Sequence, residues 1–365
     1  MPSVLSALGI SGEPATLELA ATSRCVVLLV DGLGHELLLR YGEHAPFLSS
    51  LAGRRLTAGF PSTTVTSLAS FGTGLPPGEH GLTGYTSWVE EVDDAVAWLT
   101  WTTLTGGQDL RERLVPEQVQ PASTAFERAA LDGVAVTVTA PATFKHSGLT
   151  RAVLRGGHYR GAVTAGDAVA HATEGSRLGS RSLVFCYTPD LDLTGHARGV
   201  NSEAWLSQLR LVDRFAEELA SRLPSGTALY VTADHGMIDV SESARVDFDS
   251  SPRLAAGVRA LAGEPRARHV HCLPGAVNDV LATWQSELGD RMWVGRGADA
   301  VSAGLLGVRV TDVARSRVGD VVAIATGDVA IVRSRAETLV ARLLGHHGAL
   351  TADELFVPLL TTHLT

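Results

Sequence analysis

Two short runs in this sequence each join a carboxylate to an imidazole. The first is Asp192-Leu-Thr-Gly-His196 and the second is Asp234-His235, and each follows an apolar run that is typical of a buried strand. Mixed sets of Asp and His suit zinc or manganese better than magnesium, which prefers oxygen ligands alone. The two runs therefore predict parts of one metal centre.

Three separate residues extend this candidate centre. Asp31 follows the apolar run 26–30 and precedes the turn Gly32-Leu-Gly34, which lets other groups approach closely. Thr64 lies where a helix is expected to begin, and His347 lies near the C-terminus. Taken alone, Asp31 is equally compatible with a turn-forming aspartate. Combined with the two Asp/His runs, the three residues predict a two-metal site with a threonine nucleophile.

The nucleophile segment is Phe60-Pro61-Ser62-Thr63-Thr64, which predicts a turn and an N-cap before a helix that ends at Gly72 or Gly74. A hydroxyl at a helix start faces free backbone N–H groups and the positive end of the dipole, which favour an alkoxide and a phosphate oxyanion. Threonine is a weak nucleophile unless it is deprotonated, so a metal ion must hold its oxygen. The alternative interpretation is that the hydroxyls of residues 62–66 only cap the helix.

The spacing inside each Asp/His run leaves the ligand choice open. Asp192 and His196 lie in a segment too irregular to predict a helix, so a tight loop is expected to point both at one cation, with Asp190 as the rival carboxylate. On an extended strand, the adjacent Asp234 and His235 would point to opposite faces. Both can reach metal only if the chain turns after them, and they could then serve different ions.

The remaining histidines have simpler interpretations. His269 and His271 would share one face of a strand, which is acceptable ligand geometry. A packed or surface pair is the favoured interpretation, because histidine is intermediate in burial preference. Three others are expected to be surface or hydrogen-bonding residues: His44, His80 and His346.

Apolar, β-branched runs alternate with longer helical patterns along the chain. The candidate strands of the main sheet are Cys25–Val30, Val134–Thr139, Ser182–Tyr187, Ala228–Thr232 and, later, Val321–Ala325. The candidate helices between them are Ala125–Leu131 and Trp205–Leu223. This alternation predicts an α/β fold with a largely parallel sheet flanked by helices. Because ligands bind at the carboxyl ends of parallel strands, the polar loops that follow four of these strands support a shared site.

The character of the sequence changes between residues 240 and 320. Candidate strands at Ala267–Leu273 and Met292–Val294 accompany a helical pattern at Ala276–Leu288, and Gly and Arg are frequent. We expect a smaller α/β insertion here that caps the site. The predicted domains are therefore a catalytic core formed by 1–239 with 321–365, and an inserted cap subdomain at 240–320.

Composition narrows the class of protein. The net charge of −9 over 365 residues, without a basic stripe, argues against binding polymeric nucleic acid. The sequence contains no run of about 18 uncharged apolar residues, so no membrane span is expected. The first residues carry no basic segment, so no signal peptide is expected, and the three scattered cysteines predict no disulfide framework. These features predict a cytoplasmic location.

The sequence resembles the type I phosphodiesterase/nucleotide pyrophosphatase family of the alkaline phosphatase superfamily. Asp192-Leu-Thr-Gly-His196 matches the Asp-x-x-Gly-His pattern of that family, which favours Asp192 over Asp190, and Asp234-His235-Gly-Met is the most specific signature. Phe60-Pro61-Ser62-Thr63-Thr64 fits the nucleophile segment, and His347-Gly348 matches the final ligand with its glycine. The resemblance runs from the first strand to the C-terminal Val-Pro-Leu-Leu and is weakest in the insertion.

The resemblance implies an alkaline-phosphatase-like fold and two divalent metal ions, with zinc expected and manganese as the alternative. One ion would be held by Asp192, His196 and His347. The other would be held by Asp31, Thr64, Asp234 and His235. Two cations about 4 Å apart stabilise both the attacking and the leaving oxygen of an in-line displacement. Thr64 would form a covalent phospho- or nucleotidyl-enzyme.

One departure from the family pattern concerns the substrate. Relatives carry an asparagine shortly after the His80-Gly81 position to hold a phosphoryl oxygen, whereas this chain has Tyr85 and Thr86 there. Tyr85 or Thr86 would donate to the substrate instead. Lys145, the only lysine in the chain, would provide a further phosphate contact.

The first functional hypothesis is therefore a phosphodiesterase for nucleotide-type substrates, with cyclic di-AMP cleaved to pApA and AMP as its most specific form. The second is a phosphonate or phosphomonoester hydrolase, similar to phosphonoacetate hydrolases, on the same site. The third is a relative that binds a phosphorylated ligand without turning it over. Suitable groups at all seven expected metal and nucleophile positions argue against the third hypothesis.

Overall fold

One apolar run, buried on both of its faces, forms the central strand of the fold. In this computed structural model, which describes residues 1–364, the run forms strand β1 (Arg24–Val30). Its odd-numbered side chains enter one hydrophobic core and its even-numbered side chains enter another. Successive side chains of a strand point to opposite faces, so a strand with no polar position after its first residue must be covered on both sides.

The sheet around β1 is mostly parallel, as predicted. Its order is β2 (Ala52–Thr57), β18 (Phe356–His363), β9 (Thr227–Thr232), β1, β8 (Ser182–Thr188), β6 (Ala135–Pro141) and β7 (His158–Ala162). The five strands from β9 to β7 are parallel, whereas β18 pairs antiparallel with both β2 and β9. The carboxyl ends of β1, β8 and β9 therefore meet at one edge of the sheet.

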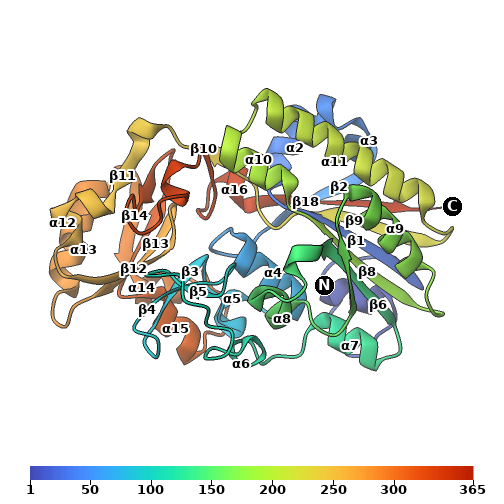
Figure 1. The fold of residues 1–365 in the computed structure, drawn as a ribbon, viewed down its shortest axis with the longest axis horizontal. Helices are drawn as coiled ribbons and strands as arrows, with labels where there is room; N and C mark the ends of the chain where they lie inside the picture. Colours follow the sequence, from blue (N-terminus) through green and yellow to red (C-terminus); the bar gives the residue numbers. More distant parts are fainter. Residues whose placement is uncertain (365) are drawn as a thin grey trace.

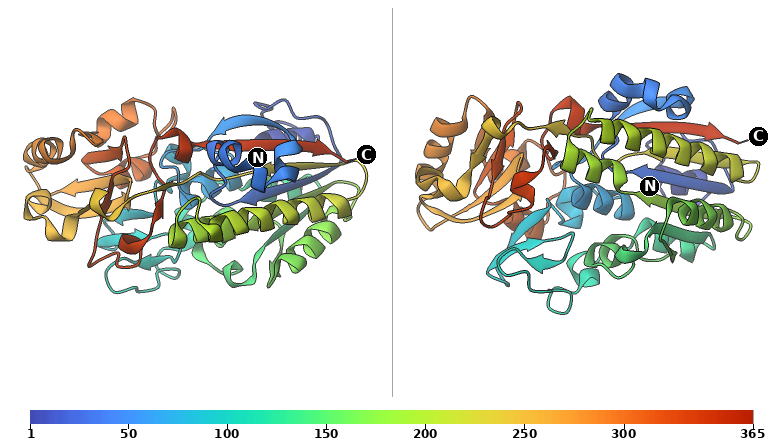
Figure 2. Two further views of the ribbon diagram at one scale, coloured as in Figure 1. Left: turned by 90° about the horizontal axis from the view of Figure 1, so that it is seen from above. Right: turned by 45° about the horizontal axis from the view of Figure 1, so that its top comes forward.

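Helices cover both faces of this sheet (Figure 1). One face carries α2 (His35–Tyr41), α3 (Pro46–Ser50), α9 (Ala165–Ser176) and the long α11 (Glu203–Arg222). The other face carries α1 (Pro2–Ala7), α4 (Thr64–Thr73), α7 (Ala125–Leu131) and α8 (Gly148–Val153). Figure 2 shows α11 running along the sheet. We call this sheet and its helices the first lobe.

A second lobe lies beside the first (Figures 1 and 2). Its antiparallel sheet has the order β14 (Met292–Arg296), β15 (Val321–Ala325), β13 (Ala267–Cys272), β12 (Val258–Glu264), β3 (Thr86–Val89), β4 (Asp94–Ala97) and β5 (Thr102–Thr103). The helices α12 (Pro252–Ala255), α13 (Val277–Leu288), α14 (Gly297–Ser302) and α15 (Asp312–Val318) belong to this lobe.

The second sheet corrects one prediction. The strand Val321–Ala325 was expected in the main sheet, but it pairs with β13 and β14 in the second lobe. An apolar run predicts burial and does not reveal its partner strands. The second sheet also takes β3–β5 from the N-terminal part of the chain. Its strands thus cross the predicted boundaries at 240 and 320, and the division into core and cap subdomain stays a prediction.

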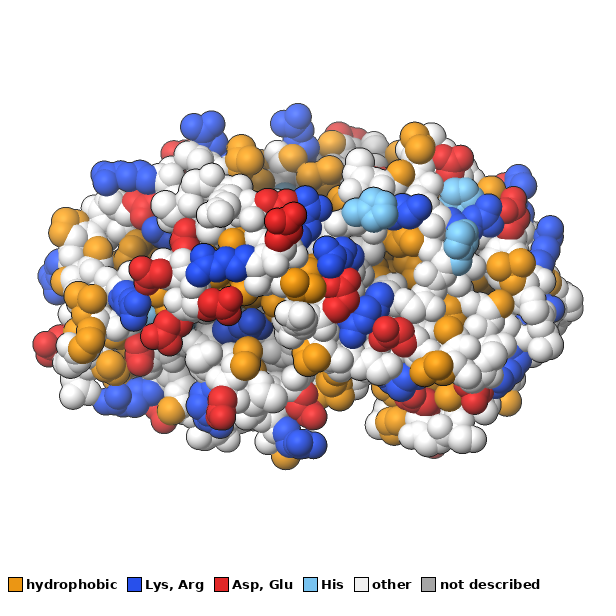
Figure 3. Space-filling view, turned by 60° about the horizontal axis from the view of Figure 1, so that its bottom comes forward, with side chains coloured by type: hydrophobic (Ala, Val, Ile, Leu, Met, Phe, Trp, Pro, Cys, Tyr) orange, Lys and Arg blue, Asp and Glu red, His pale blue; other side chains and the backbone are white. Residues whose placement is uncertain are grey.

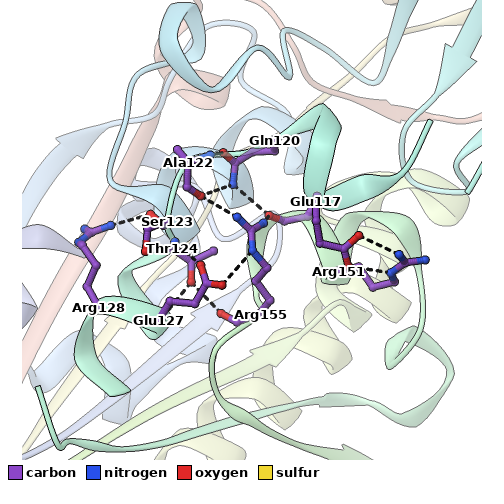
Figure 4. Close-up of polar contacts among 10 residues, drawn as sticks. Glu117, Gln120, Ala122, Ser123, Thr124, Glu127, Arg128, Arg151 and Arg155 are labelled. Atoms are coloured by element: carbon purple, nitrogen blue, oxygen red, sulfur yellow. Dashed lines mark hydrogen bonds and ion pairs between the residues drawn. The ribbon is translucent and has the colours of Figure 1, made fainter. Parts of the chain in front are cut away.

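Polar contacts brace the outer side of the first lobe around α6 (Pro116–Val119), α7 and α8 (Figure 4). Arg151 forms a two-pronged ion pair with Glu117, at 2.9 and 2.8 Å. Arg155 pairs with Glu127 at 3.1 Å, and Glu127 completes a capping box with Thr124 at the start of α7. These contacts join three short helices, of which α7 and α8 also pack into the hydrophobic core of the first lobe. Among residues 1–364 no helix has the length and apolar character needed to cross a bilayer.

Candidate metal centre

Six of the predicted ligands converge into two groups of three. In each group one ligand atom from every residue lies within 4.8 Å of the others. The first group is Asp31, Asp234 and His235, and the second group is Asp192, His196 and His347. The membership of each group is the one that the family resemblance implied.

The first group is assembled by two neighbouring parallel strands. Asp31 follows β1 directly, and Asp234 and His235 lie beyond the last residue of β9. Because the chain has left the strand before Asp234, the two adjacent side chains are free to reach one place. A Cβ on Gly236 would lie 1.9 Å from the carbonyl oxygen of Asp353. Only glycine fits this close approach. Gly236 therefore lets the chain pass against Asp353 directly after the two ligands, and the chain bends at Asp234.

The second group depends on a helix where a loop was expected. Residues 190–198 form α10 (Asp190–Arg198), so Asp192 and His196 share one helix face, with 3.2 Å between Asp192 Oδ2 and His196 Nε2. Gly195 made the segment look irregular, but it is required by packing, since a Cβ there would lie 2.4 Å from Met237 Sδ. The rival carboxylate, Asp190, is exposed and belongs to neither group.

Two contacts connect the groups to each other. Gly32 has φ +74°, and a Cβ on it would lie 3.0 Å from Cα and Cβ of Asp192. The rings of His235 and His347 stack with centroids 3.7 Å apart, although the two residues belong to different groups. The six side chains therefore form one continuous cluster.

Backbone carbonyls fix the tautomer of all three imidazoles. The Nδ1–H group of His196 donates to Gly345 O at 2.7 Å, that of His235 donates to Gly236 O at 2.9 Å, and that of His347 donates to Ser62 O at 2.9 Å. Each Nε2 atom then points into the cluster, where it can ligate a metal ion once it has no proton. This arrangement is typical of histidines that ligate metal.

The three carboxylates share a second pattern, in which one oxygen is held and the other is free. Asp234 Oδ1 accepts from the N–H groups of Gly32 and His235, at 3.2 and 3.1 Å. Asp31 Oδ2 accepts from the Tyr187 hydroxyl. The other oxygens are buried and have no hydrogen-bond partner among the described residues: Asp31 Oδ1, Asp192 Oδ1 and Asp234 Oδ2. Buried carboxylate oxygens without partners are costly, and cations at both groups would satisfy them.

The electrostatics of the bare protein agree with this interpretation. Burial and the neighbouring carboxylates of Asp234 and Asp192 raise the pKa of Asp31 well above its usual range. Burial acts to raise the pKa of Asp192 too, but the attraction of His196 and His347 outweighs it and lowers that pKa. Burial acts to lower the pKa of His196, and Asp192 raises it to about 9. A divalent cation would replace the proton that this pair attracts.

Thr64 is the first residue of α4 and lies at the edge of the cluster. Its Oγ1 is 3.2 Å from Nε2 of His235. The alternative that these hydroxyls only cap the helix is not what the structure shows, because the N-cap, Thr63, forms no capping hydrogen bond. Instead Ser67 Oγ donates to Asp234 O at 2.7 Å and Ser62 Oγ donates to Ala349 O at 2.7 Å. These hydroxyls hold α4 against the segments that carry the ligands.

The predicted substrate contacts have different environments. The backbone N–H of Tyr85 donates to Glu264 Oε1, and burial and Glu337 raise the pKa of the Tyr85 phenol to about 12. Thr86 is buried, and its hydroxyl donates to Gly263 O at 3.0 Å, so it is already occupied. Lys145 is exposed beyond the carboxyl end of β6 and forms no ion pair among the described residues.

The other histidines lie outside the two groups. His269 is fully buried and His271 nearly so, which agrees with a packed pair, and burial lowers the pKa of His269 to about 3. His80 and His346 are buried and hydrogen bonded, to Ser70 Oγ and Leu343 O respectively. His44 accepts a hydrogen bond from Arg210.

Sequence reasoning missed two residues beside the cluster. Tyr187, which donates to Asp31, is the last buried residue of β8, so its position at a strand end was a usable signal. Glu264 ends β12 in the second lobe and is 3% exposed. Burial raises its pKa to about 7, opposed by hydrogen bonds from Tyr85 and Thr63. No sequence pattern places Glu264 here, because it reaches the site from the other lobe.

The chain belongs to the type I phosphodiesterase/nucleotide pyrophosphatase family, whose model matches residues 25–350. Members of this family are metal-dependent enzymes that hydrolyse phosphodiesters and pyrophosphates, and the chain is therefore a hydrolase of this class. No curated protein sequence matches it significantly.

Two kinds of enzyme are among the solved structures with the same fold. Human ectonucleotide pyrophosphatase/phosphodiesterase 5 superposes with a TM-score of 0.72 and 17% identity, over 93% of this chain and 87% of that chain. The murine protein, inactivated by a Thr-to-Ala substitution and in complex with AMP, gives 0.70 and 17% over 92% and 87%. Phosphonoacetate hydrolase from Sinorhizobium meliloti 1021, in complex with phosphonoformate, gives 0.68 and 18% over 93% and 90%. These likenesses confirm the alkaline-phosphatase-like fold.

Proposed function

We propose that this protein is a two-metal phosphodiesterase that hydrolyses nucleotide-type phosphodiesters with Thr64 as its nucleophile. The observation that carries the proposal is the set of three buried, unpartnered carboxylate oxygens beside the Thr64 hydroxyl. Asp31, Asp234, His235 and Thr64 would hold one ion, and Asp192, His196 and His347 the other. The three free Nε2 atoms favour zinc, with manganese as the alternative.

When bound, the two cations would neutralise the carboxylates and stabilise charge on the attacking and leaving oxygens. The N-terminal N–H groups of α4 face the same region and favour a phosphoryl oxygen. The Thr64 oxygen would form a bond to phosphorus as the bond to the leaving oxygen breaks, which gives a phospho- or nucleotidyl-threonine. Water would then cleave that ester, release the product and restore the hydroxyl.

The most specific form of the proposal is cleavage of cyclic di-AMP to pApA and AMP. A nucleotide-sized substrate is supported by the family and by the AMP complex of the murine relative. Tyr85 would replace the usual phosphate-binding asparagine, since the Thr86 hydroxyl is occupied. Lys145 is exposed and free to meet a second phosphate at the same edge of the sheet. A cytoplasmic location suits such a substrate and stays a prediction.

The second candidate is a phosphonate or phosphomonoester hydrolase on the same residues. The fold of phosphonoacetate hydrolase, matched over 93% of this chain, is the observation that favours it. Rates on bis-p-nitrophenyl phosphate and on the mono-ester, with added zinc or manganese, separate the two candidates. A clear preference for the diester is expected, and a preference for the mono-ester or for phosphonoacetate would overturn the first choice.

Three variants test the residue roles. Thr64→Ala should abolish turnover while elemental analysis still finds close to two metal ions per chain, the number expected for a two-metal site. Unchanged turnover would remove Thr64 from the role of nucleophile and would support a site at Thr63 or elsewhere. Asp192→Asn should lower metal occupancy, whereas its matched control, Asp190→Asn on the exposed first turn of the same helix, should not. The opposite order would show that the ligand assignment is wrong.

A further inference from the structure

A second cavity lies away from the metal ligands, between α5 (Pro77–His80), β3, α6 and α15. Its volume is about 630 Å³, which is within the usual range for small-molecule sites. None of the six Asp and His ligands lines it. Figure 3 views the molecule from the side on which α6 and α15 lie, and basic and acidic side chains crowd together there.

A buried cation without a counter-charge forms part of the cavity wall. Arg317 of α15 is only 6% exposed, and its Nη1 donates to Gly81 O at 2.6 Å. Its guanidinium carbon lies 4.8 Å from the ring centroid of Trp98. No carboxylate among the described residues forms an ion pair with it, and burial lowers its pKa to about 10. Its Nε and Nη2 groups have no hydrogen-bond acceptor among those residues.

Two further residues of the same wall carry nitrogen groups that could contact an anion. His271 is 8% exposed, and its Nε2 is buried without a hydrogen-bond partner. Arg259 is partly exposed, stacks 4.9 Å above the Trp88 ring and pairs with Asp93. Three glutamates also line the cavity. Glu90 and Glu91 are exposed, where water screens their charge, and Glu79 is half-buried and pairs with Arg309 at 3.9 Å.

The contrast with other buried arginines of the second lobe is informative. Arg266 and Arg268 are fully buried, and each is matched by a glutamate in a two-pronged pair. A buried charge without such a partner is expensive. Arg317 is buried to a similar extent, and the planar guanidinium fork suits the oxygens of a phosphate or carboxylate.

We propose that this cavity is a second ligand site, which binds a small oxyanion, a phosphate or carboxylate group, through Arg317. His271 would offer a further polar contact, and Arg259 would attract the anion at the entrance. The proposal does not depend on the reaction at the metal centre, because no ligand of that centre lines the cavity.

Calorimetric titration of the metal-loaded protein with inorganic phosphate tests the proposal. Two phosphate sites per chain are expected, one at each place, and Arg317→Gln should leave one. Inhibition of turnover measures phosphate binding at the metal centre alone. The inhibition constant of phosphate should therefore be unchanged in Arg317→Gln. A variant that binds as many phosphate ions as the wild type, with undiminished affinity, would overturn the proposal for phosphate.

A second series keeps the test decisive if Arg317→Gln does not fold. Arg317→Lys keeps the charge and loses the fork, and His271→Phe keeps the ring and loses the nitrogen. Each should weaken the second site about tenfold, the effect of one lost hydrogen bond to a charged group. Arg253→Gln, at an exposed arginine of α12, is the matched control and should change nothing.

Malonate in place of phosphate distinguishes the two sources of oxyanion. Malonate binding that is lost in Arg317→Gln, without phosphate binding at the second place, would support the site and assign it to carboxylates. The absence of second-site binding for both anions in the wild type would overturn it.

Discussion

Buried carboxylates are balanced differently in two neighbouring parts of this molecule. At the junction of the lobes, Glu354 of α16 (Ala352–Leu355) accepts hydrogen bonds from Nε and Nη2 of Arg266, both at 2.7 Å. Glu337 is bound in the same two-pronged way by Arg268. In the metal cluster, by contrast, each of three aspartates keeps one oxygen without a partner.

This difference in partners separates carboxylates that join segments of the chain from carboxylates proposed to bind metal. Where a carboxylate only joins segments, the chain supplies its own guanidinium, and Glu354 also accepts the N–H of Ala349 at 3.0 Å, two residues after His347. Beside the three aspartates proposed to hold metal ions, the described residues supply no arginine or lysine partner. Glu264 is an intermediate case. Its raised pKa favours a bound proton, where the other carboxylates have an arginine or a proposed metal ion.

Removal of the metal ions should give the largest effect. A ligand that binds only the folded state at a thousandfold excess over its Kd stabilises by about 4 kcal/mol, so two ions would contribute about 8 kcal/mol. We expect a chelator to abolish turnover and to lower the melting temperature sharply in scanning calorimetry. An unchanged melting temperature after proven loss of metal would contradict the proposal that bound cations neutralise the three aspartates.

Breaking one structural pair should be the next largest effect. Arg266→Met leaves the Glu354 carboxylate buried without a partner, which costs about 3–5 kcal/mol. Unfolding in urea measures this loss. The double variant Arg266→Met with Glu354→Leu is the control and should recover much of the stability. A double variant no more stable than the single one would show that the pair is not balanced as described.

Glu264 should give a smaller effect that depends on pH. Burial raises its pKa from 4.5 to about 7, so the folded state holds the proton more tightly than the unfolded state. Relative to Glu264→Gln, the wild type should therefore lose stability as pH rises from 4.5 to about 7, by at most about 3 kcal/mol, and then stay level. Urea unfolding of both proteins across this window measures the difference. A constant difference would mean that Glu264 is ionised throughout.

The smallest effect is expected at the outer network of Figure 4. Arg151 and Glu117 are 37% and 39% exposed, so water screens their pair. Arg151→Gln should cost less than about 1 kcal/mol, and added salt should reduce the cost further. A loss as large as that of Arg266→Met would erase the distinction between the two kinds of pair.

Much of the first lobe was predictable, because its central strands are buried on both faces and end in polar loops. Cys25–Val30 followed by Asp31 is a local pattern, and parallel strands bring such ends together without further information. The helix that begins at Thr64 was also predictable from local sequence, since its C-cap is Gly74, which adopts φ +78°.

The rest depended on contacts between distant segments. The helix around Asp192 was missed because Gly195 weakens helical propensity, whereas its packing against Met237 is visible only in the fold. Val321–Ala325 was assigned to the wrong sheet because burial does not specify partners. Glu264 was missed because the second lobe supplies it.

Strand β18, close to the C-terminal end, lies between β2 and β9 and runs against both. During synthesis on the ribosome, Asp31, Asp234 and His235 all leave the exit tunnel well before His347 and this closing strand. His347 is therefore the last of the six ligands to be synthesised, and it completes the second three-ligand group.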